Sequence, residues 1–489
     1  PPAERSYYCR DSIKRMSDTD PQYTEQLYID GEWHDGDDTI AVRDLADGGT
    51  VSHVAAASSK QAETALTAAD NAQHAMRETT PVERADWLEA IADEVESRAD
   101  EFAELIVREA GKPISSASGA PPSAARRFRR AAAEARDLSK TYGEYREGST
   151  PGHEGWTAIV KPEPIGTVLC IAPYNYPIQT TTLQVAPALA AGNSIILKPS
   201  SKTPTTAALL TDAITSAVDL PDGALNFVPG HSGEIGDTLA GDDRVDTIAM
   251  TGSSGAGHHV ARESGMVNLV MELGGNAPAV VFPDANLEDA AGACTAGSVK
   301  FGGQRCSAVS RVLAHESVHD DLVTQIKLTM EGWVIGDLFE EETDFGPLID
   351  EAHAKDVKTL IDDAVDTGAE LVLGGERDGA FVEPTLLGNV PQDADIINEE
   401  QFGPVAAVTT FEAESEAIEL ANGDRYALDA SVFTTDHDRA MRVAQAIDAG
   451  GVRLNGAPSH GLGDIPFGGN GASGINREGI HAAIEQMIR

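Results

Sequence analysis

The stretch GTVLCIAPYNYPIQTTTLQVAPALAAGNSIILKPS, residues 166–200, predicts an apolar strand, a helix and a second apolar strand. The first strand ends in APYNYP, the helix covers TTTLQVAPALAAG, and the second strand ends in ILKPS. Short apolar runs that alternate with helices are typical of the strands of a parallel sheet. Residues 166–200 therefore predict an α/β fold, and the following sequence extends the same pattern.

A helical segment, PTTAALLTDAITSAV, follows the second strand, and two more strand–helix units come after it. GALNFVPG precedes SGEIGDTLAGD, and VDTIAMTGS precedes a helix that runs to about residue 264. Four such units in succession predict a doubly wound parallel sheet. Ligands of such sheets bind beyond the carboxyl ends of the strands.

A second alternating set begins at NAPAVVF and runs to about residue 450, with strands expected at SRVLAHE, ELVLGG and VAAVTTF. Helical periodicity also fills residues 58–111 and the segment ARRFRRAAAEARDLS. The fold class is therefore α/β, with two doubly wound domains joined near Gly274 and Gly275. A chain of 489 residues is long enough for two or three hydrophobic cores.

The charge of the chain excludes several kinds of partner. It has 79 acidic and 36 basic residues, a formal net charge of −43. Such a field repels nucleic acid and anionic lipid, so we expect neither as a partner. The acidity is spread along the chain, and few of the basic residues are lysines, which indicates a halophilic surface that stays soluble in high salt.

The location of the protein is expected to be cytoplasmic. No run of 18 apolar residues is present, and the segment PPAERSYYCRDSIKRM lacks the apolar core of a secretion signal. Four cysteines in a chain of this length form no disulfide framework, which favours a reducing compartment.

One of the cysteines lies in an unusual setting, FGGQRCSAV, residues 301–309. A free thiol has a pKa of about 8.5, and a neighbouring cation such as Arg305 increases its thiolate fraction. The two glycines allow close approach of the backbone. Taken alone, Cys306 also fits a small buried hydrophobic residue.

Two other motifs contain groups that could assist a nucleophile. Glu272 ends an apolar strand in MELGGNAP, where burial would raise its pKa and suit it to act as a base. Asn175, in APYNYP, ends an apolar strand and carries an amide that could donate to an oxyanion. The alternatives are a salt-bridged glutamate at a hinge and a turn asparagine.

Together these segments resemble the aldehyde dehydrogenase superfamily over nearly the whole chain. The resemblance rests, in order, on PYNYP, LKPS, MTGSSGAG, MELGGNAP, FGGQRC, EEQFGPV and PFGGNGASGINREG. It implies that Cys306 is the nucleophile, Glu272 the general base and Asn175 an oxyanion donor. The implied reaction is oxidation of an aldehyde to an acid through a cysteine thioester.

The resemblance also implies a nicotinamide cofactor and the residues that bind it. Lys198 would face the adenosine ribose, and Ser253 with the following helix start would meet the pyrophosphate. Glu400 would hold the nicotinamide ribose and Phe402 would pack near the ring, although a surface carboxylate and a core aromatic are alternatives. The remaining expected contacts are Ser200, Gly252 and Gly257.

Ser201 bears on the choice between NAD and NADP. Many NAD-preferring relatives carry a glutamate at this position, which binds the ribose hydroxyls and repels a 2′-phosphate. Here Ser201 is followed by Lys202. The resemblance therefore favours NADP, with NAD possible.

Within the superfamily the chain is most similar to non-phosphorylating NADP-dependent glyceraldehyde-3-phosphate dehydrogenases, through GQRC and NGAPSHGLGDIPF. This implies that Arg305 and Tyr176 contact a substrate phosphate. His460 stands where an arginine is expected. IPFGGNGASGINREGI is also similar to lactaldehyde and semialdehyde dehydrogenases, so glyceraldehyde 3-phosphate, glyceraldehyde, lactaldehyde and a semialdehyde all stay open.

The expected domains follow the same resemblance. Residues 1–25 form a polar lead, 26–141 and 161–273 a cofactor-binding domain, 274–465 a catalytic domain, and 142–160 with 466–489 a bridging or oligomerisation element. A homodimer or homotetramer is expected.

Two function classes compete with this interpretation. One is a catalytically silent scaffold with the same fold, against which the joint presence of Cys306, Glu272 and Asn175 argues. The other is a metal-dependent hydrolase. His258 and His259 are adjacent in a helix and do not share a face, and no metal-binding spacing is present.

Overall fold

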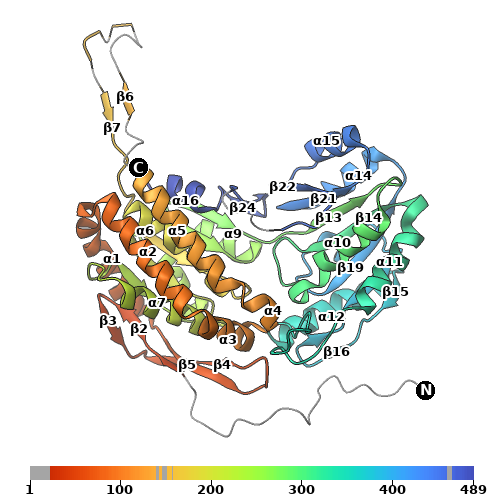
Figure 1. Cartoon of the computed structure of the whole chain (residues 1–489), viewed down its shortest axis with the longest axis horizontal. Helices are drawn as coiled ribbons and strands as arrows, with labels where there is room; N and C mark the ends of the chain where they lie inside the picture. Colours follow the sequence, from red (N-terminus) through yellow and green to blue (C-terminus); the bar gives the residue numbers. More distant parts are fainter. Residues whose placement is uncertain (1–22, 139–142, 146–150, 153, 157, 460–464) are drawn as a thin grey trace.

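The computed structural model describes residues 23–138, 143–145, 151–152, 154–156, 158–459 and 465–489. Two α/β lobes, each built around its own central sheet, lie side by side (Figure 1). The chain passes between the sheets where β12 (Asn268–Glu272) ends and β13 (Ala277–Val281) begins. The predicted fold class, two doubly wound α/β domains, is confirmed.

The first sheet has eight strands in the order β24-β12-β11-β8-β9-β10-β2-β3. Its five inner strands are parallel and are those predicted from the strand–helix units, with β12 added. The edge strands are antiparallel. The bounds of these strands, apart from β12, are β11 (Thr247–Thr251), β8 (Thr167–Ile171), β9 (Ser194–Lys198), β10 (Leu225–Phe227), β2 (Leu27–Ile29), β3 (Glu32–His34) and β24 (Gly474–Ile475).

Helices cover both faces of this sheet. α1 (Ser59–Glu78) and α2 (Pro81–Ser97) begin with capping boxes, in which Ser58 and Thr80 accept from the backbone three residues on. α3 (Ala99–Ala110) ends at Gly111, whose φ of 69° suits glycine. The other helices around this sheet are α5 (Ala120–Leu138), α6 (Pro177–Ala191), α7 (Pro204–Ala217), α8 (Asp237–Ala240), α9 (Ser254–Glu263) and α16 (Ile480–Gln486).

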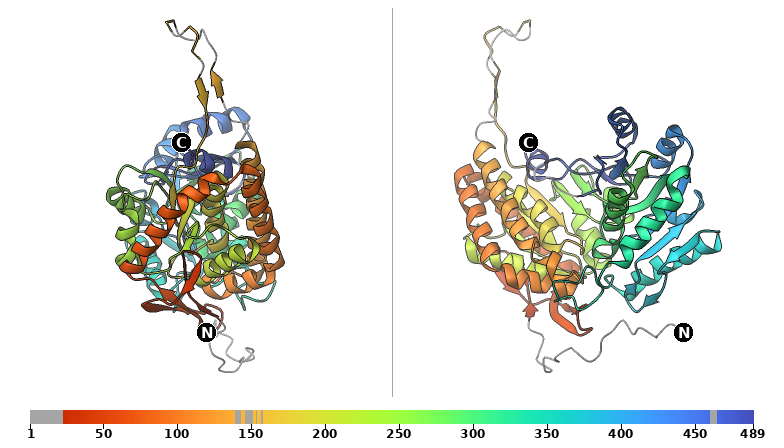
Figure 2. Two further views of the ribbon diagram at one scale, coloured as in Figure 1. Left: turned by 90° about the vertical axis from the view of Figure 1, so that its left-hand side faces the viewer. Right: turned by 45° about the vertical axis from the view of Figure 1, so that its right-hand side comes forward.

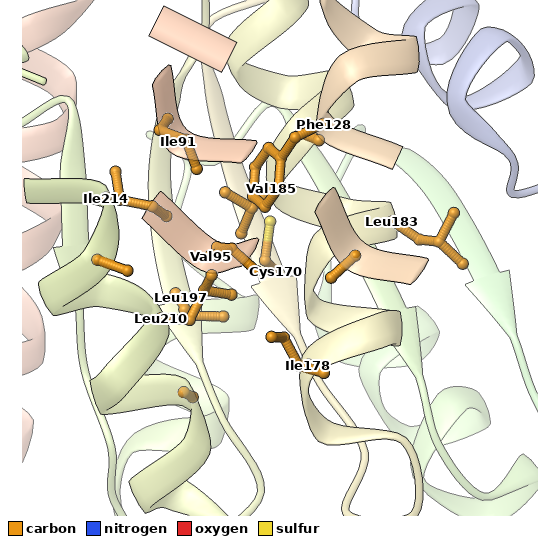
Figure 3. Packing of buried hydrophobic residues seen from close by; sticks show 14 of the residues in the cluster. Ile91, Val95, Phe128, Cys170, Ile178, Leu183, Val185, Leu197, Leu210 and Ile214 are labelled. Atoms are coloured by element: carbon orange, nitrogen blue, oxygen red, sulfur yellow. The ribbon is translucent and has the colours of Figure 1, made fainter. Parts of the chain in front are cut away.

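The core on one face of the first sheet surrounds Cys170 of β8 (Figure 3). This thiol is fully buried and burial raises its pKa, so it behaves as an apolar residue. Neighbouring residues on β8 face opposite cores, since Val168 and Cys170 belong to one cluster and Leu169 to the other. Figure 3 shows around Cys170 the side chains of Ile91, Val95, Phe128, Ile178, Leu183, Val185, Leu197, Leu210 and Ile214.

The second sheet has seven strands in the order β15-β18-β19-β14-β13-β21-β22. All neighbours are parallel except β15, which comes from the predicted ELVLGG strand and pairs antiparallel at the edge. Apart from β13, the strands are β15 (Glu370–Leu373), β18 (Thr385–Gly388), β19 (Val405–Phe411), β14 (Val309–His315), β21 (Asp429–Phe433) and β22 (Gly451–Leu454).

This sheet is also covered on both faces. On β13, Ala279 and Val281 pack toward α10 (Leu287–Val299) and α11 (His319–Glu331). Val280 packs on the other side with α14 (Glu414–Ala421) and α15 (His437–Ala446). α12 (Glu351–Asp366) packs against β19 through a separate cluster.

Smaller elements complete the structure. β1 (Tyr23–Glu25), part of the expected polar lead, pairs with β5 (Thr50–Ala56) beside β4 (Asp38–Arg43); residues 1–22 lie outside the described part. The hairpin of β6 (Gly143–Tyr145) and β7 (Ala158–Val160) extends away from the body in both views of Figure 2. Among the described helices, none combines the length and apolar character needed to cross a membrane.

Candidate active site

A cavity of about 1050 Å³ lies at the carboxyl ends of β8, β9, β11 and β12, and residues of the second lobe line its other side. Its position is the one expected for a doubly wound sheet. Twelve of the residues predicted from the sequence line it: Asn175, Tyr176, Lys198, Ser200, Ser201, Gly252, Ser253, Glu272, Arg305, Cys306, Glu400 and Phe402. Gly257 does not line it, and His460 lies outside the described residues.

The loop that carries Cys306 has an unusual backbone. After α10, Phe301, Gly302 and Gly303 all have positive φ, at 57°, 62° and 71°. A Cβ on Gly303 would lie 1.9 Å from the carbonyl oxygen of Gly403, so only glycine fits this close approach. The half-buried Cys306 thus reaches the cavity from a tight loop.

Cys306 and Glu272 form the chemical centre of the cavity. The Glu272 carboxylate is buried, and its Oε1 has no hydrogen-bond partner. Burial and then the charge of Glu478 raise the pKa of Glu272 well above its usual value, and a hydrogen bond with the Cys306 thiol opposes the rise. Burial, followed by the charge of Glu272 and this hydrogen bond, raises the pKa of Cys306.

The surroundings of the thiol differ from the sequence-based expectation. Arg305 was expected to promote the thiolate, but carboxylates, those of Glu272, Glu478 and Asp429, dominate the charges that act on Cys306. The guanidinium of Arg305 donates instead to the carbonyl oxygens of Ala296 and Gly297 near the end of α10. The resting thiol is therefore protonated, and a base is needed to activate it.

Asn175 lies beside this loop. Its Nδ2 donates to the carbonyl oxygen of Gln304 at 2.9 Å, which leaves its second N–H for another acceptor. Gln304 is fully buried, and its own Oε1 accepts from the backbone N–H of Ile349 at 2.9 Å. Gln304 directly precedes Arg305 and Cys306, so its hydrogen bond joins Asn175 to the loop that carries Cys306, a role that sequence reasoning missed.

The second lobe contributes Glu400 and Phe402. Glu400 Oε1 accepts from the backbone N–H of Gly275 at 3.0 Å, and burial raises the pKa of Glu400 to about 7. Phe402 has a φ of 48° and packs edge-on against Tyr174, with ring centroids 6.1 Å apart. Glu400 is thus a half-buried residue whose carboxylate, like Phe402, lines the cavity.

The other end of the cavity suits a dinucleotide. Lys198 is buried with a pKa lowered by burial to about 8, and its Nζ donates to Ser232 Oγ at 3.0 Å. Ser253 caps α9, whose N-terminal turn borders the cavity and offers free backbone N–H groups to a phosphate. Gly257 instead serves packing, since a Cβ there would lie 2.5 Å from Leu273.

Lys202, which follows Ser201, has its ammonium group engaged in an ion pair. Its Nζ pairs with Asp350 Oδ2 at 2.8 Å, and Lys202 is not among the lining residues. Ser201 lines the cavity and carries no charge. Of these two neighbouring residues, Ser201 is therefore the one that faces the cavity.

Basic residues gather at the substrate end. Arg126, Arg127 and Arg130 of α5 line the cavity together with Lys300 and Arg305. Arg127 is held by a hydrogen bond from its Nη1 to the carbonyl oxygen of Gln179 at 2.9 Å. These basic side chains share the lining of the cavity with the carboxylates of Glu272, Glu400 and Glu478, and they could meet an anionic group there.

Comparison with known proteins agrees with this geometry. The aldehyde dehydrogenase family matches residues 33–489. The chain belongs to the aldehyde dehydrogenase family. It is therefore an oxidoreductase that acts on an aldehyde, on a fold that binds NAD or NADP.

Individual relatives of this aldehyde dehydrogenase cover almost its whole length. The 3-sulfolactaldehyde dehydrogenase of Priestia aryabhattai is 35% identical over 463 residues, 94% of this chain and 96% of that protein. The lactaldehyde dehydrogenase of Methanococcus maripaludis (strain C7 / ATCC BAA-1331) is 32% identical over 464 residues, 94% of this chain and 98% of that one. A crystal structure of NADP-dependent glyceraldehyde-3-phosphate dehydrogenase from Bacillus halodurans C-125 complexed with NADP matches with a TM-score of 0.93 at 34% identity, covering 96% of this chain and 98% of the other.

Two buried carboxylates of this aldehyde dehydrogenase also escaped the sequence analysis. Glu478, in the NREG segment, lines the cavity and raises the pKa of Glu272. Asp429, at the start of β21, has both oxygens buried without a partner, and burial raises its pKa to about 7. Nothing in the local sequence around either residue separates it from a surface carboxylate.

The metal-dependent alternative gains no support from the described residues, which contain no cluster of potential ligands. His259 pairs with Asp237 at 2.7 Å.

Proposed function

We propose that the protein oxidises a short, anionic aldehyde to the carboxylic acid through a thioester on Cys306, with NADP as preferred cofactor. The observation that carries the proposal is that the Cys306 thiol and the buried Glu272 carboxylate line the same cavity, where each shifts the pKa of the other. A base with a raised pKa beside a protonated thiol can take up the thiol proton and later activate water.

The chemistry follows from these groups. The Cys306 sulfur attacks the aldehyde carbon, and the amide of Asn175 donates to the resulting oxyanion. When bound, NADP or NAD supplies the acceptor for the hydride that leaves this carbon. Glu272, which accepted the thiol proton, passes that proton to solvent and then takes a proton from the water that attacks the thioester carbonyl. The acid and the Cys306 thiol are released.

The cofactor preference rests on Ser201. A carboxylate at this position would bind ribose hydroxyls and repel a 2′-phosphate, whereas a serine accepts either cofactor and removes the repulsion. The relative from Bacillus halodurans was crystallised with NADP. NADP is accordingly the first cofactor to assay, and NAD the second.

An anionic aldehyde is favoured by the basic residues of α5 together with Lys300 and Arg305. Arg305 and Tyr176 are the proposed contacts for the charged end, and His460 is a further candidate from the sequence. Glyceraldehyde 3-phosphate fits this field, as does the sulfonate that the name of the Priestia relative implies for its substrate. Lactaldehyde and glyceraldehyde, which are neutral, and a carboxylate-bearing semialdehyde are the competing substrates.

The test is an assay of NADP and NAD reduction in molar KCl against a panel of phosphorylated, sulfonated, carboxylated and neutral short aldehydes. Preference for a neutral aldehyde would remove the anionic substrate and leave the oxidation chemistry standing. A silent scaffold would turn over none of them. Iodoacetamide labelling of Cys306, with and without aldehyde, distinguishes the silent scaffold from an enzyme. Bound aldehyde slows the labelling of Cys306 only in a site that binds its substrate.

The composition of the chain and its family also suggest where the enzyme is located, how it assembles and how its domains divide. We propose a cytoplasmic homodimer or homotetramer with a halophilic surface, in which residues 26–141 and 161–273 bind the cofactor, 274–465 carry the nucleophile, and 142–160 with 466–489 form the bridging element. Size-exclusion chromatography with light scattering, at low and at molar KCl, tests the assembly and its salt dependence.

A further inference from the structure

Lys112 is a buried cation that the proposed reaction does not use. It follows Gly111 at the end of α3 and is 2% exposed. Within the described residues no hydrogen bond or ion pair reaches its ammonium group. Burial, and then repulsion from Lys300 and Arg305, lowers the pKa of Lys112 to about 7. A buried charge without a counter-ion is costly, so a reason for its retention is needed.

The ammonium group contacts two aromatic rings. Lys112 Nζ lies 3.7 Å from the ring centroid of Tyr176 and 4.5 Å from that of Phe301. The two rings pack edge-on against each other with centroids 5.9 Å apart. Cation–π contacts of this kind are strongest when they are desolvated, as they are here.

Each ring belongs to a different catalytic loop. Tyr176 directly follows Asn175, the proposed oxyanion donor, and lines the cavity. Phe301 opens the loop to Cys306 with a φ of 57°, a conformation that a bulky residue keeps only when its surroundings hold it. One ammonium group therefore contacts both loops.

The two loops are joined a second time by hydrogen bonds. The carbonyl oxygen of Phe301 accepts from the backbone N–H of Gln304 at 3.2 Å. The carbonyl oxygen of Gln304 accepts from Asn175 Nδ2 at 2.9 Å. Contacts thus run in a closed ring through Lys112, Phe301, Gln304, Asn175 and Tyr176, and this ring joins the two loops.

We propose that Lys112 is a positioning residue, whose ammonium group clamps Tyr176 and Phe301 together and thereby fixes the Asn175 amide relative to Cys306. The inference rests on the proposed roles of Asn175 and Cys306 and adds a residue that contacts neither substrate nor cofactor. The role of the buried Lys112 charge is then to hold the oxyanion site in its geometry.

The test compares Lys112→Met, which keeps the apolar stem and removes the charge, with Lys112→Arg, whose guanidinium can still stack on both rings. Lys112→Met should lower kcat/KM by roughly ten- to a hundredfold, mainly through kcat, and leave NADPH affinity unchanged. Lys112→Arg should retain most of the activity. The exposed Lys355→Met is the matched control for loss of a lysine charge.

Coupling to Asn175 separates positioning from general packing. If Lys112 acts through Asn175, the double variant Lys112→Met with Asn175→Ala should show a smaller fold-loss in kcat/KM than the product of the two single fold-losses. Three outcomes would overturn the proposal. The fold-losses in kcat/KM could multiply in the double variant, kcat/KM could stay unchanged in Lys112→Met, or Lys112→Met and Lys112→Arg could lose kcat/KM equally. Should Lys112→Met fail to fold, Phe301→Leu removes one ring of the clamp and must show the same coupling.

The Asn175→Ala variant alone tests the underlying function. Unchanged kcat/KM in that variant would remove the oxyanion role and the clamp with it. A large loss in Asn175→Ala beside none in Lys112→Met would overturn the clamp alone.

Discussion

The Glu272 carboxylate and the Cys306 thiol line the same cavity, and the charge of Glu272 acts together with burial to raise the pKa of Cys306. The arrangement stores the nucleophile in its protonated, unreactive form. It also places a proton acceptor in the same cavity, so that activation needs only a proton transfer over a short distance. A thiol held in this way is protected from chance oxidation until a substrate arrives.

The first prediction concerns the titration of the thiol. Glu272→Gln removes a negative charge next to Cys306, so the pKa of Cys306 should fall and its thiolate should form at lower pH. Burial, the largest cause of the shift, persists, and the pKa should stay above its ordinary value. The pH dependence of iodoacetamide labelling at Cys306 measures the change, and a midpoint that stays in place or rises would contradict it.

The second prediction concerns deacylation. Glu272→Gln should still form one equivalent of NADPH, but more slowly than the wild type because the thiol has lost its proton acceptor, and should then stall at the thioester because no base activates water. Rapid-mixing absorbance and mass measurement of the trapped acyl-enzyme check this. Absence of both burst and acyl-enzyme would show that Glu272 is needed already for attack on the aldehyde.

The third prediction separates two cysteines. Cys306→Ser should abolish aldehyde oxidation while NADPH still binds. Cys294 is fully buried on α10, and burial raises its pKa to about 12. Cys294→Ala should therefore keep turnover at a stability cost on the order of 1 kcal/mol, read from thermal unfolding. The opposite pattern of losses would move the nucleophile to Cys294.

The fourth prediction concerns the cofactor. Ser201→Glu should shift the NADP-to-NAD ratio of kcat/KM toward NAD by roughly 1–3 kcal/mol, about 5- to 150-fold. Because Lys202 is paired with Asp350, Lys202→Met should shift the ratio much less. A larger effect from Lys202→Met would assign the preference to the lysine.

The fifth prediction concerns the substrate anion. Losing one charge-assisted contact costs about 1.5–3 kcal/mol, so Arg305→Leu should lower kcat/KM for glyceraldehyde 3-phosphate by roughly ten- to a hundredfold. Arg305 also supports the backbone at the end of α10, and that loss affects every substrate alike. The informative quantity is the ratio to unphosphorylated glyceraldehyde, and an unchanged ratio would exclude Arg305 as a phosphate contact.

Much of this structure could be predicted from the sequence because its signals are local. The apolar runs that became β8, β9, β10 and β11 alternate with helices, and the carboxyl ends of parallel strands necessarily meet. Lys198 and Glu272 are the last residues of β9 and β12, and Asn175 lies four residues beyond the end of β8 rather than at its end as predicted. Their meeting with Cys306 followed from the family resemblance.

The residues that escaped prediction depend on contacts between distant segments. The ion pair of Lys202 joins β9's loop to the start of α12, and no pattern around either partner indicates it. Lys112 lies two residues after the end of α3, an ordinary amphipathic helix. Only the tertiary fold brings its ammonium group against the rings of Tyr176 and Phe301. Long-range burial changes the chemistry of such groups without changing the sequence near them.

The eight-stranded sheet has a consequence for how the protein is made. β24 pairs with β12 so that Gly474 lies opposite Glu272, and a Cβ on Gly474 would lie 2.2 Å from the carbonyl oxygen of Met271. During synthesis on the ribosome β12 emerges long before β24, and until then its backbone is an open sheet edge that other chains can pair with. The lobe whose sequence is translated first therefore cannot complete its sheet until nearly all of the second lobe has been synthesised, and Glu272 gains its final surroundings only then.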